Sequence, residues 1–166
     1  IFIFHPVVTE LDSMKKQIQE VIACLIESNQ NYIVVYPNND PGSDIIIDEL
    51  KTLENNKQFK IFPSIRFKNF LTLLKHANFV IGNSSSGIIE APYFGKNVMN
   101  IGSRQDGRDK DTSVYDVKAE ISSVNLFLNR FLNKKLKLKT CNELYGDGNS
   151  SEIIINVLKK ELNVIL

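Results

Sequence analysis

Residues 78–90 join three kinds of sequence that together could bind an anion. A short apolar run ends at Gly82, and the small polar residues 83–87 follow it before helical spacing resumes. Serines at a helix start cap backbone N–H groups, and these N–H groups together with the helix macrodipole favour a bound anion. Small side chains also let a diphosphate come close to the backbone. Taken alone, the stretch predicts either a phosphate-binding turn or a capped helix that binds nothing.

Polar and aromatic residues also follow the other apolar runs of the chain. We call the small polar residues 83–87 the serine turn. Together with residues 84–86 of this turn, the set is His5, Asn38, Phe62 and Arg104. The strands of a parallel α/β sheet end at one edge, and ligands bind at that edge. We therefore expect these residues to converge. His5 taken alone is also compatible with an ordinary loop histidine.

Several familiar nucleotide-binding motifs are absent or incomplete. Gly82 and Gly87 have the spacing of a P-loop, but Ile88 and Ile89 stand where its Lys-Ser or Lys-Thr would be, which excludes a P-loop NTPase. Residues 146–151 come close to a dinucleotide fingerprint, but serine replaces the third glycine and no clear strand precedes it. We interpret that segment as the turn into the last helix.

The sequence gives little support for metal or triad chemistry. Asp109-Lys110-Asp111 has the D-x-D pattern of many metal-dependent sugar-nucleotide transferases, but two carboxylates in an acidic loop often occur by chance. Two histidines and two scattered cysteines disfavour a zinc cluster, and no Ser-His-Asp set is legible. We predict no metal and no cofactor.

Composition indicates one ordinary globular domain. The 166 residues are 43% hydrophobic and 23% charged, with a net charge of +1, so no overall field favours nucleic acid or an anionic membrane. No apolar run approaches the roughly 20 residues that span a bilayer. Cys24 is expected to be a buried free thiol, far from Cys141, in a reducing, cytoplasmic setting. The chain starts at Ile1, inside an apparent strand and without a signal peptide, so we expect a fragment cut at a domain boundary.

Apolar runs that predict strands alternate with stretches of helical periodicity. The strands are expected at residues 1–4, 32–36, 59–62, 78–81, 96–101 and 114–117. The first long helix has an apolar stripe from Leu11 to Ile26 and ends at residues 29–31, and the other long helices are expected at about 43–53, 66–76, 122–132 and 151–162. Thr9 or Asp12 is expected to cap the first helix, and Ser43 or Asp44 the second. Phe67, Phe70, Leu71 and Leu74 are expected to face inward from the third, and Pro92 should shorten or kink the helix after the serine turn.

This alternation predicts an α/β fold with a parallel sheet that helices cover on both faces. The basic run 134–139 is expected to form a solvated, strand-like edge rather than a nucleic-acid patch.

Five sequence blocks together resemble the UDP-N-acetylglucosamine 2-epimerase family. They are His5-Pro6-Val7 and residues 36–43, 81–92, 100–108 and 145–149. The hydrolysing branch, which feeds the synthesis of sialic-acid-type sugars, is the better match. The other branch has His-Arg at positions 5–6 and Asp-Ser-Gly-Gly at positions 83–86, and this sequence differs at both.

The resemblance implies a glycosyltransferase-B-like enzyme built from two Rossmann-like domains. Residues 1–166 would be the single C-terminal, UDP-binding domain, and the catalytic N-terminal domain would be absent from this chain. It also implies UDP-N-acetylglucosamine or UDP as ligand, the N-terminal domain as partner, and a possible homo-oligomer.

The same resemblance implies a set of site residues around UDP: His5 as catalytic residue, and Asn38, Phe70, Ser84, Ser85, Glu90 and Arg104 as binding residues. Ser84 and Ser85 would bind the diphosphate, Glu90 the ribose hydroxyls and Phe70 the uracil. The implied reaction converts UDP-N-acetylglucosamine and water into UDP and N-acetylmannosamine, with His5 contacting the leaving phosphate or donating a proton to it. A stand-alone nucleotide-sugar-binding module and a domain of a glycosyltransferase-B-type transferase remain the alternatives.

Overall fold

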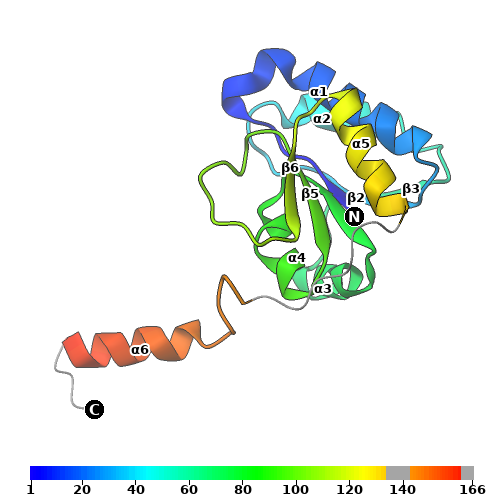
Figure 1. Cartoon of the computed structure of the whole chain (residues 1–166). Coiled ribbons are helices and arrows are strands. Elements are labelled where there is room, and N and C mark those ends of the chain that lie inside the picture. Colours follow the sequence, from blue (N-terminus) through cyan, green and yellow to red (C-terminus); the bar gives the residue numbers. More distant parts are fainter. Residues whose placement is uncertain (134–142, 162–166) are drawn as a thin grey trace.

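Six parallel strands form one sheet in the computed structural model, which describes residues 1–133 and 143–161 (Figure 1). The strand order is β3-β2-β1-β4-β5-β6, and every neighbouring pair is parallel. The strands are β1 (Phe2–Ile3), β2 (Tyr32–Val35), β3 (Phe59–Phe62), β4 (Phe79–Gly82), β5 (Asn97–Ile101) and β6 (Val114–Val117). The chain runs outward from β1 to β3, then returns to the other side of β1 for β4. This reversal leaves a crevice beyond the carboxyl ends of β1 and β4, where ligands of such sheets bind.

Helices cover both faces of the sheet, as the alternating pattern predicts (Figure 1). On one face, α1 (Leu11–Glu27), α2 (Ser43–Lys51) and α5 (Ile121–Leu132) contribute to the larger core cluster. On the other face, α3 (Phe67–His76) and the short α4 (Glu90–Tyr93) pack in a second cluster. Alternate residues of β1 serve the two sides, because successive side chains of a strand point to opposite faces.

The helix starts differ from the expected capping. A 3₁₀ turn, η1 (Val8–Glu10), precedes α1, and neither its Thr9 nor Asp12 makes a capping bond at the helix start, where Glu10 is the N-cap. The residue before α2 is Gly42, whose φ of 89° places it in the left-handed region, so the expected caps Ser43 and Asp44 already lie inside the helix. Turn geometry therefore decides both starts.

The segment after β4 is more broken than expected. Ser84 does cap it, since its side chain accepts a hydrogen bond from the Ser86 N–H. The 3₁₀ turn η2 (Ser85–Gly87) comes next, and the four residues of α4 come after it. Pro92 lies in α4, as expected for a short helix. A macrodipole needs several aligned turns, so this segment can contribute to anion binding only through its individual N–H and hydroxyl groups.

Gly82 ends β4 in a conformation that favours glycine. Its φ is 127°, and a Cβ atom there would collide with the Ile3 carbonyl oxygen of the neighbouring strand. The missing side chain lets β1 and β4 stay paired up to the residue before the serine turn. The turn and the loop after β1 therefore start side by side.

The third helix matches its predicted bounds but not every predicted orientation. Phe70 and Leu74 are buried, whereas Phe67 is 62% exposed. Phe67 is the first residue of α3, at the carboxyl edge of the sheet. The expectation that it faces the core is wrong, because the helix start projects beyond the sheet.

The last helix, α6 (Ser150–Glu161), projects away from the rest of the domain (Figure 1). All of its residues are exposed. They include five large apolar side chains: Ile153, Ile154, Ile155, Val157 and Leu158. Its apolar residues therefore have no partner in the described part of this chain.

Three further sequence expectations can be compared with the structure. Cys24 is a buried free thiol, as predicted, and burial raises its pKa to about 11. Cys141 and the basic run 134–139 lie outside the described residues. No helix among the described residues has the length and apolarity needed to cross a membrane.

Candidate functional site

His5 sits at the carboxyl end of β1, half-buried and held by its backbone. Its N–H donates to Asn83 Oδ1 at 2.6 Å, and its carbonyl accepts from Asn83 Nδ2 at 2.8 Å. Asn83 is the residue directly after β4, so this reciprocal pair joins the two strands that border the crevice. Two hydrogen bonds with the Asn83 side chain therefore fix the backbone of His5.

The ring of His5 is engaged at Nδ1 by Asn38, which follows β2. The Asn38 backbone N–H donates to Nδ1 at 3.1 Å, and Asn38 Oδ1 lies 3.0 Å from the same nitrogen. Burial and the nearby Arg104 lower the pKa of His5, against smaller opposing effects of Asn38 and Asp40. Together these effects favour the neutral ring.

Arg104 and Gln105, in the loop after β5, both donate to the backbone carbonyl of Asn83. The distances are 3.3 Å from Arg104 Nη1 and 2.8 Å from Gln105 Nε2. Arg104 Nη2 also lies 3.7 Å from the Asp40 carboxylate. Loops after β1, β2, β4 and β5 therefore meet around Asn83, and they bring His5, Asn38 and Arg104 together.

A cavity of about 260 Å³ opens beside this cluster. It is lined by Ile3, His5, Val35, Tyr36, Ile65, Phe67, Phe70, Ser84 and Ser86. Three residues predicted for the site, His5, Phe70 and Ser84, thus share one cavity. Its walls are apolar and aromatic at the start of α3 and polar at the serine turn, a combination that suits a base at one end and a phosphate at the other.

The serine turn presents its polar atoms without being buried. Ser84, Ser85 and Ser86 are all half-buried. The Ser84 hydroxyl accepts from the Ser86 N–H at 3.3 Å and lies 3.0 Å from the Ser86 hydroxyl. Ser85 begins η2 next to the cavity but is not among its lining residues.

Glu90 and Phe62 stand apart from this cavity. Glu90 lines a separate cavity of about 220 Å³ with residues 145–148, which belong to another of the family-like sequence blocks. Burial raises the pKa of the Glu90 carboxyl. Phe62 is 41% exposed and lines a third cavity, which shares Ile65 with the first.

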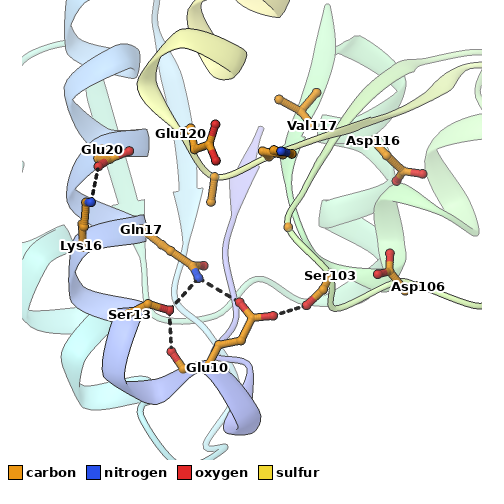
Figure 2. A pocket seen from close by; sticks show the side chains of 13 residues that line it. Glu10, Ser13, Lys16, Gln17, Glu20, Ser103, Asp106, Asp116, Val117 and Glu120 are labelled. Atoms are coloured by element: carbon orange, nitrogen blue, oxygen red, sulfur yellow. Dashed lines mark hydrogen bonds and ion pairs between the residues drawn. The ribbon is translucent and has the colours of Figure 1, made fainter.

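A larger cavity, of about 590 Å³, lies elsewhere and has the wrong charge for a diphosphate (Figure 2). Five carboxylates and two lysines line it: Glu10, Glu20, Asp106, Asp116, Glu120, Lys16 and Lys118. Within it, Glu10 accepts hydrogen bonds from Ser103 and from Gln17 Nε2, which lower the pKa of its carboxyl. These bonds tie the loop that carries Arg104 to the start of α1.

The D-x-D segment serves structural contacts. The Asp109 carbonyl accepts from the Tyr145 hydroxyl at 2.6 Å, and Lys110 pairs with Asp116 at 2.8 Å. Asp111 Oδ1 accepts from the Ser113 N–H at 2.8 Å.

Three residues of the cluster carry no role in the sequence-based prediction: Asp40, Asn83 and Gln105. All three lie inside the sequence blocks that carry the resemblance. Their place in these blocks is the one sequence feature that could have marked them as site residues. Asn83 and Gln105 are 1% and 2% exposed, and long-range burial of an amide cannot be inferred from local pattern.

The fold and the crevice define a doubly wound α/β domain of the kind that binds nucleotides. A family model described as UDP-N-acetylglucosamine 2-epimerase matches residues 1–159. The chain therefore belongs to the UDP-N-acetylglucosamine 2-epimerase family, as the sequence blocks indicate.

Curated relatives support the hydrolysing branch. A UDP-N,N'-diacetylbacillosamine 2-epimerase (hydrolyzing) of Legionella pneumophila is 38% identical over 160 residues, covering 96% of this chain and 42% of that protein. A UDP-N-acetylglucosamine 2-epimerase of Neisseria meningitidis is 44% identical over 124 residues, covering 75% and 33%. A polysialic acid biosynthesis protein of Escherichia coli is 35% identical over 126 residues. The chain thus spans less than half the length of these relatives.

Solved structures confirm the fold. Staphylococcus aureus MnaA with UDP superposes with a TM-score of 0.74 at 20% identity, covering 99% of this chain and 45% of that one. The N. meningitidis UDP-GlcNAc 2-epimerase bound to UDP-GlcNAc has a TM-score of 0.76 at 19% identity, covering 96% and 44%. The expected fold class, a Rossmann-like half of a glycosyltransferase-B-like architecture, is confirmed.

Proposed function

We propose that this chain is the C-terminal, UDP-binding domain of a hydrolysing UDP-N-acetylglucosamine 2-epimerase, which forms N-acetylmannosamine and UDP. The observation that carries the proposal is the cavity at the β1/β4 crevice, where His5, Phe70 and Ser84 meet. Family membership over residues 1–159 and relatives named as hydrolysing epimerases support the same reading.

The diphosphate is assigned to the polar end of that cavity. Ser84 and Ser85 offer hydroxyl and backbone N–H donors, and Arg104 supplies a cation held close by its bond to the Asn83 carbonyl. Hydrogen bonds to phosphate are charge-assisted and therefore strong. Asn38 takes part through its contact with His5 rather than as a lining residue of the cavity.

His5 is assigned to the leaving phosphate. As UDP departs from C1 of the sugar, negative charge grows on the diphosphate, and donors already in place act where the transition state needs them. With Nδ1 engaged by Asn38, the Nε2 side of the ring is left for the ligand within the described part of the chain. A base removes the C2 proton as UDP leaves, and water then adds to the intermediate with inversion at C2.

The base and ribose are assigned to the remaining features. Phe70, with the exposed Phe67 at the mouth of the cavity, gives the uracil an aromatic wall. Glu90 is half-buried in the cavity that residues 145–148 also line, and it is assigned to the ribose hydroxyls. The nucleotide would then extend from one cavity to the other.

The remainder of the enzyme is assigned to a catalytic N-terminal domain. The carboxylates that handle the C2 proton would belong to it, and this chain alone would bind nucleotide without turnover. The exposed apolar residues of α6 offer that domain a docking surface, and a homo-oligomer would be a second way to cover them. The buried free thiol of Cys24 is in keeping with a cytoplasmic enzyme.

Titration of the chain with UDP, followed by NMR, tests the site. We expect the His5 ring signals and the amides of Ser84, Ser85 and Ser86 to shift at millimolar UDP or below. With 2′-deoxy-UDP, affinity should fall, and Glu90→Gln should remove most of that difference. Unshifted serine amides at millimolar UDP would refute the site. Release of N-acetylmannosamine by the full-length protein would separate an epimerase from a transferase or a binding module.

A further inference from the structure

Asp40, in the turn after β2, has two partners for its carboxylate. Asn38 Nδ2 donates to Asp40 Oδ2 at 2.6 Å, and Arg104 Nη2 is 3.7 Å from the same oxygen. A carboxylate only accepts hydrogen bonds, so the close contact requires the nitrogen of the Asn38 amide to face Asp40. The amide oxygen must then point the other way.

That orientation places the Asn38 amide oxygen against His5. Oδ1 lies 3.0 Å from Nδ1, and the Asn38 backbone N–H donates to Nδ1 at 3.1 Å. A neutral ring with its proton on Nε2 accepts from the N–H, whereas a doubly protonated ring donates from Nδ1 to Oδ1. Asn38 therefore offers Nδ1 a partner in both protonation states, provided that its amide keeps this orientation.

Two charged groups act on His5 from the surrounding loops. The Arg104 guanidinium, from the loop after β5, disfavours the charged ring, and the Asp40 carboxylate favours it. Burial and Arg104 outweigh Asn38 and Asp40, so the net effect lowers the pKa of His5. A bound diphosphate would add negative charge next to Arg104 and shift the balance toward the imidazolium.

We propose that Asp40 is a positioning residue, which orients the Asn38 amide so that His5 can take up a proton when a nucleoside diphosphate binds. The proton comes from solvent, a bond forms between it and Nδ1, and Nδ1–H donates to Asn38 Oδ1. No bond of the nucleotide breaks in this step. The coupling to a nucleoside diphosphate rests on the function proposed above, whereas the orienting role of Asp40 does not.

Titration of the two histidines of the unliganded chain by NMR tests the orienting role. Asp40→Ala removes both the charge and the acceptor for Asn38, and Asp40→Asn removes the charge alone. We expect the pKa of His5 to fall in both variants and further in Asp40→Ala. His76 serves as internal reference, and Asp44→Ala, an exposed carboxylate four residues on, as matched control. Equal shifts in the two Asp40 variants, or none, would overturn the role.

A double-mutant cycle separates orientation from simple charge. In an Asn38→Ala background no amide is left to orient. The two double variants, Asn38→Ala with Asp40→Asn and Asn38→Ala with Asp40→Ala, should therefore have the same His5 pKa. A difference that persists in that background would mean that Asp40 acts on His5 without Asn38, against the proposal.

Calorimetry with UDP, in buffers of different ionisation enthalpy at about pH 7, tests the coupling. We expect the wild-type chain to take up protons on binding UDP, and Asp40→Ala to take up fewer. Binding without proton uptake in the wild type would overturn the coupling and leave the proposed function standing. A chain that fails to bind UDP would refute both the function and the coupling, whereas the histidine titration would still report on the orienting role.

Discussion

Ser84 combines two roles that one substitution can test. Its hydroxyl caps the turn by accepting from the Ser86 N–H, and we assign the same hydroxyl to the diphosphate. A hydrogen bond to a charged group contributes about 1.5–3 kcal/mol, so Ser84→Ala should weaken UDP binding roughly 10- to 100-fold. Ser43→Ala, at a turn whose serine makes no capping bond, is the control and should leave the UDP affinity unchanged. Isothermal titration calorimetry measures both.

The lowered pKa of His5 makes stability depend on pH. The pKa of His5 in the folded chain lies below the unfolded value of 6.5, so at acidic pH the folded chain binds fewer protons than the unfolded chain. The contribution of the neutral His5 ring to the free energy of unfolding is therefore fully present above pH 6.5. It is lost as the pH falls from 6.5 toward the lowered pKa. We expect the melting temperature of His5→Gln to fall less than that of the wild type between about pH 7.5 and 5. Equal slopes for His5→Gln and the wild type would contradict the burial argument.

At the level of the elements, the junction between β1 and β4 controls the site. Gly82→Ala would drive a Cβ atom into the Ile3 carbonyl at a φ of 127°, and we expect a loss of at least about 3 kcal/mol in the free energy of unfolding. Gly102 also has a positive φ, of 77°, but open space around it, so Gly102→Ala should cost only about 1–2 kcal/mol. Urea denaturation compares the two. Equal losses would mean that the strand contact contributes nothing.

The elements also explain which predictions held. Strand and helix order followed from local apolar runs, and α3, β6 and α5 lie within a residue of their expected bounds. The capping predictions for α1 and α2 were wrong because a 3₁₀ turn and a left-handed Gly42 set those helix starts. The expected helix after β4 is two short turns, which transfers anion binding from a helix dipole to individual donors.

Among the described residues, the buried core lies in the sheet and the helices packed on it, so we expect these to contribute most of the stability and α6 little. Leu158 of α6 is 50% exposed, so Leu158→Ala should change the free energy of unfolding by less than about 0.5 kcal/mol. Leu128 of α5 is 2% exposed, and Leu128→Ala should cost about 2–5 kcal/mol. Chemical denaturation of this chain measures both. A large loss for Leu158→Ala would mean that α6 packs on the domain.

The sequence by itself determined the alternation of strands and helices, the small-residue turn after β4 and the blocks that mark the family, because each is written in neighbouring residues. Only the tertiary structure decided that Asn83 braces His5, that Asp40 faces Asn38 and Arg104, and that Glu90 opens into a separate cavity. Those contacts join loops after β1, β2, β4 and β5. The strand order brings these loops together, and residues far apart in the chain meet only when the sheet has formed.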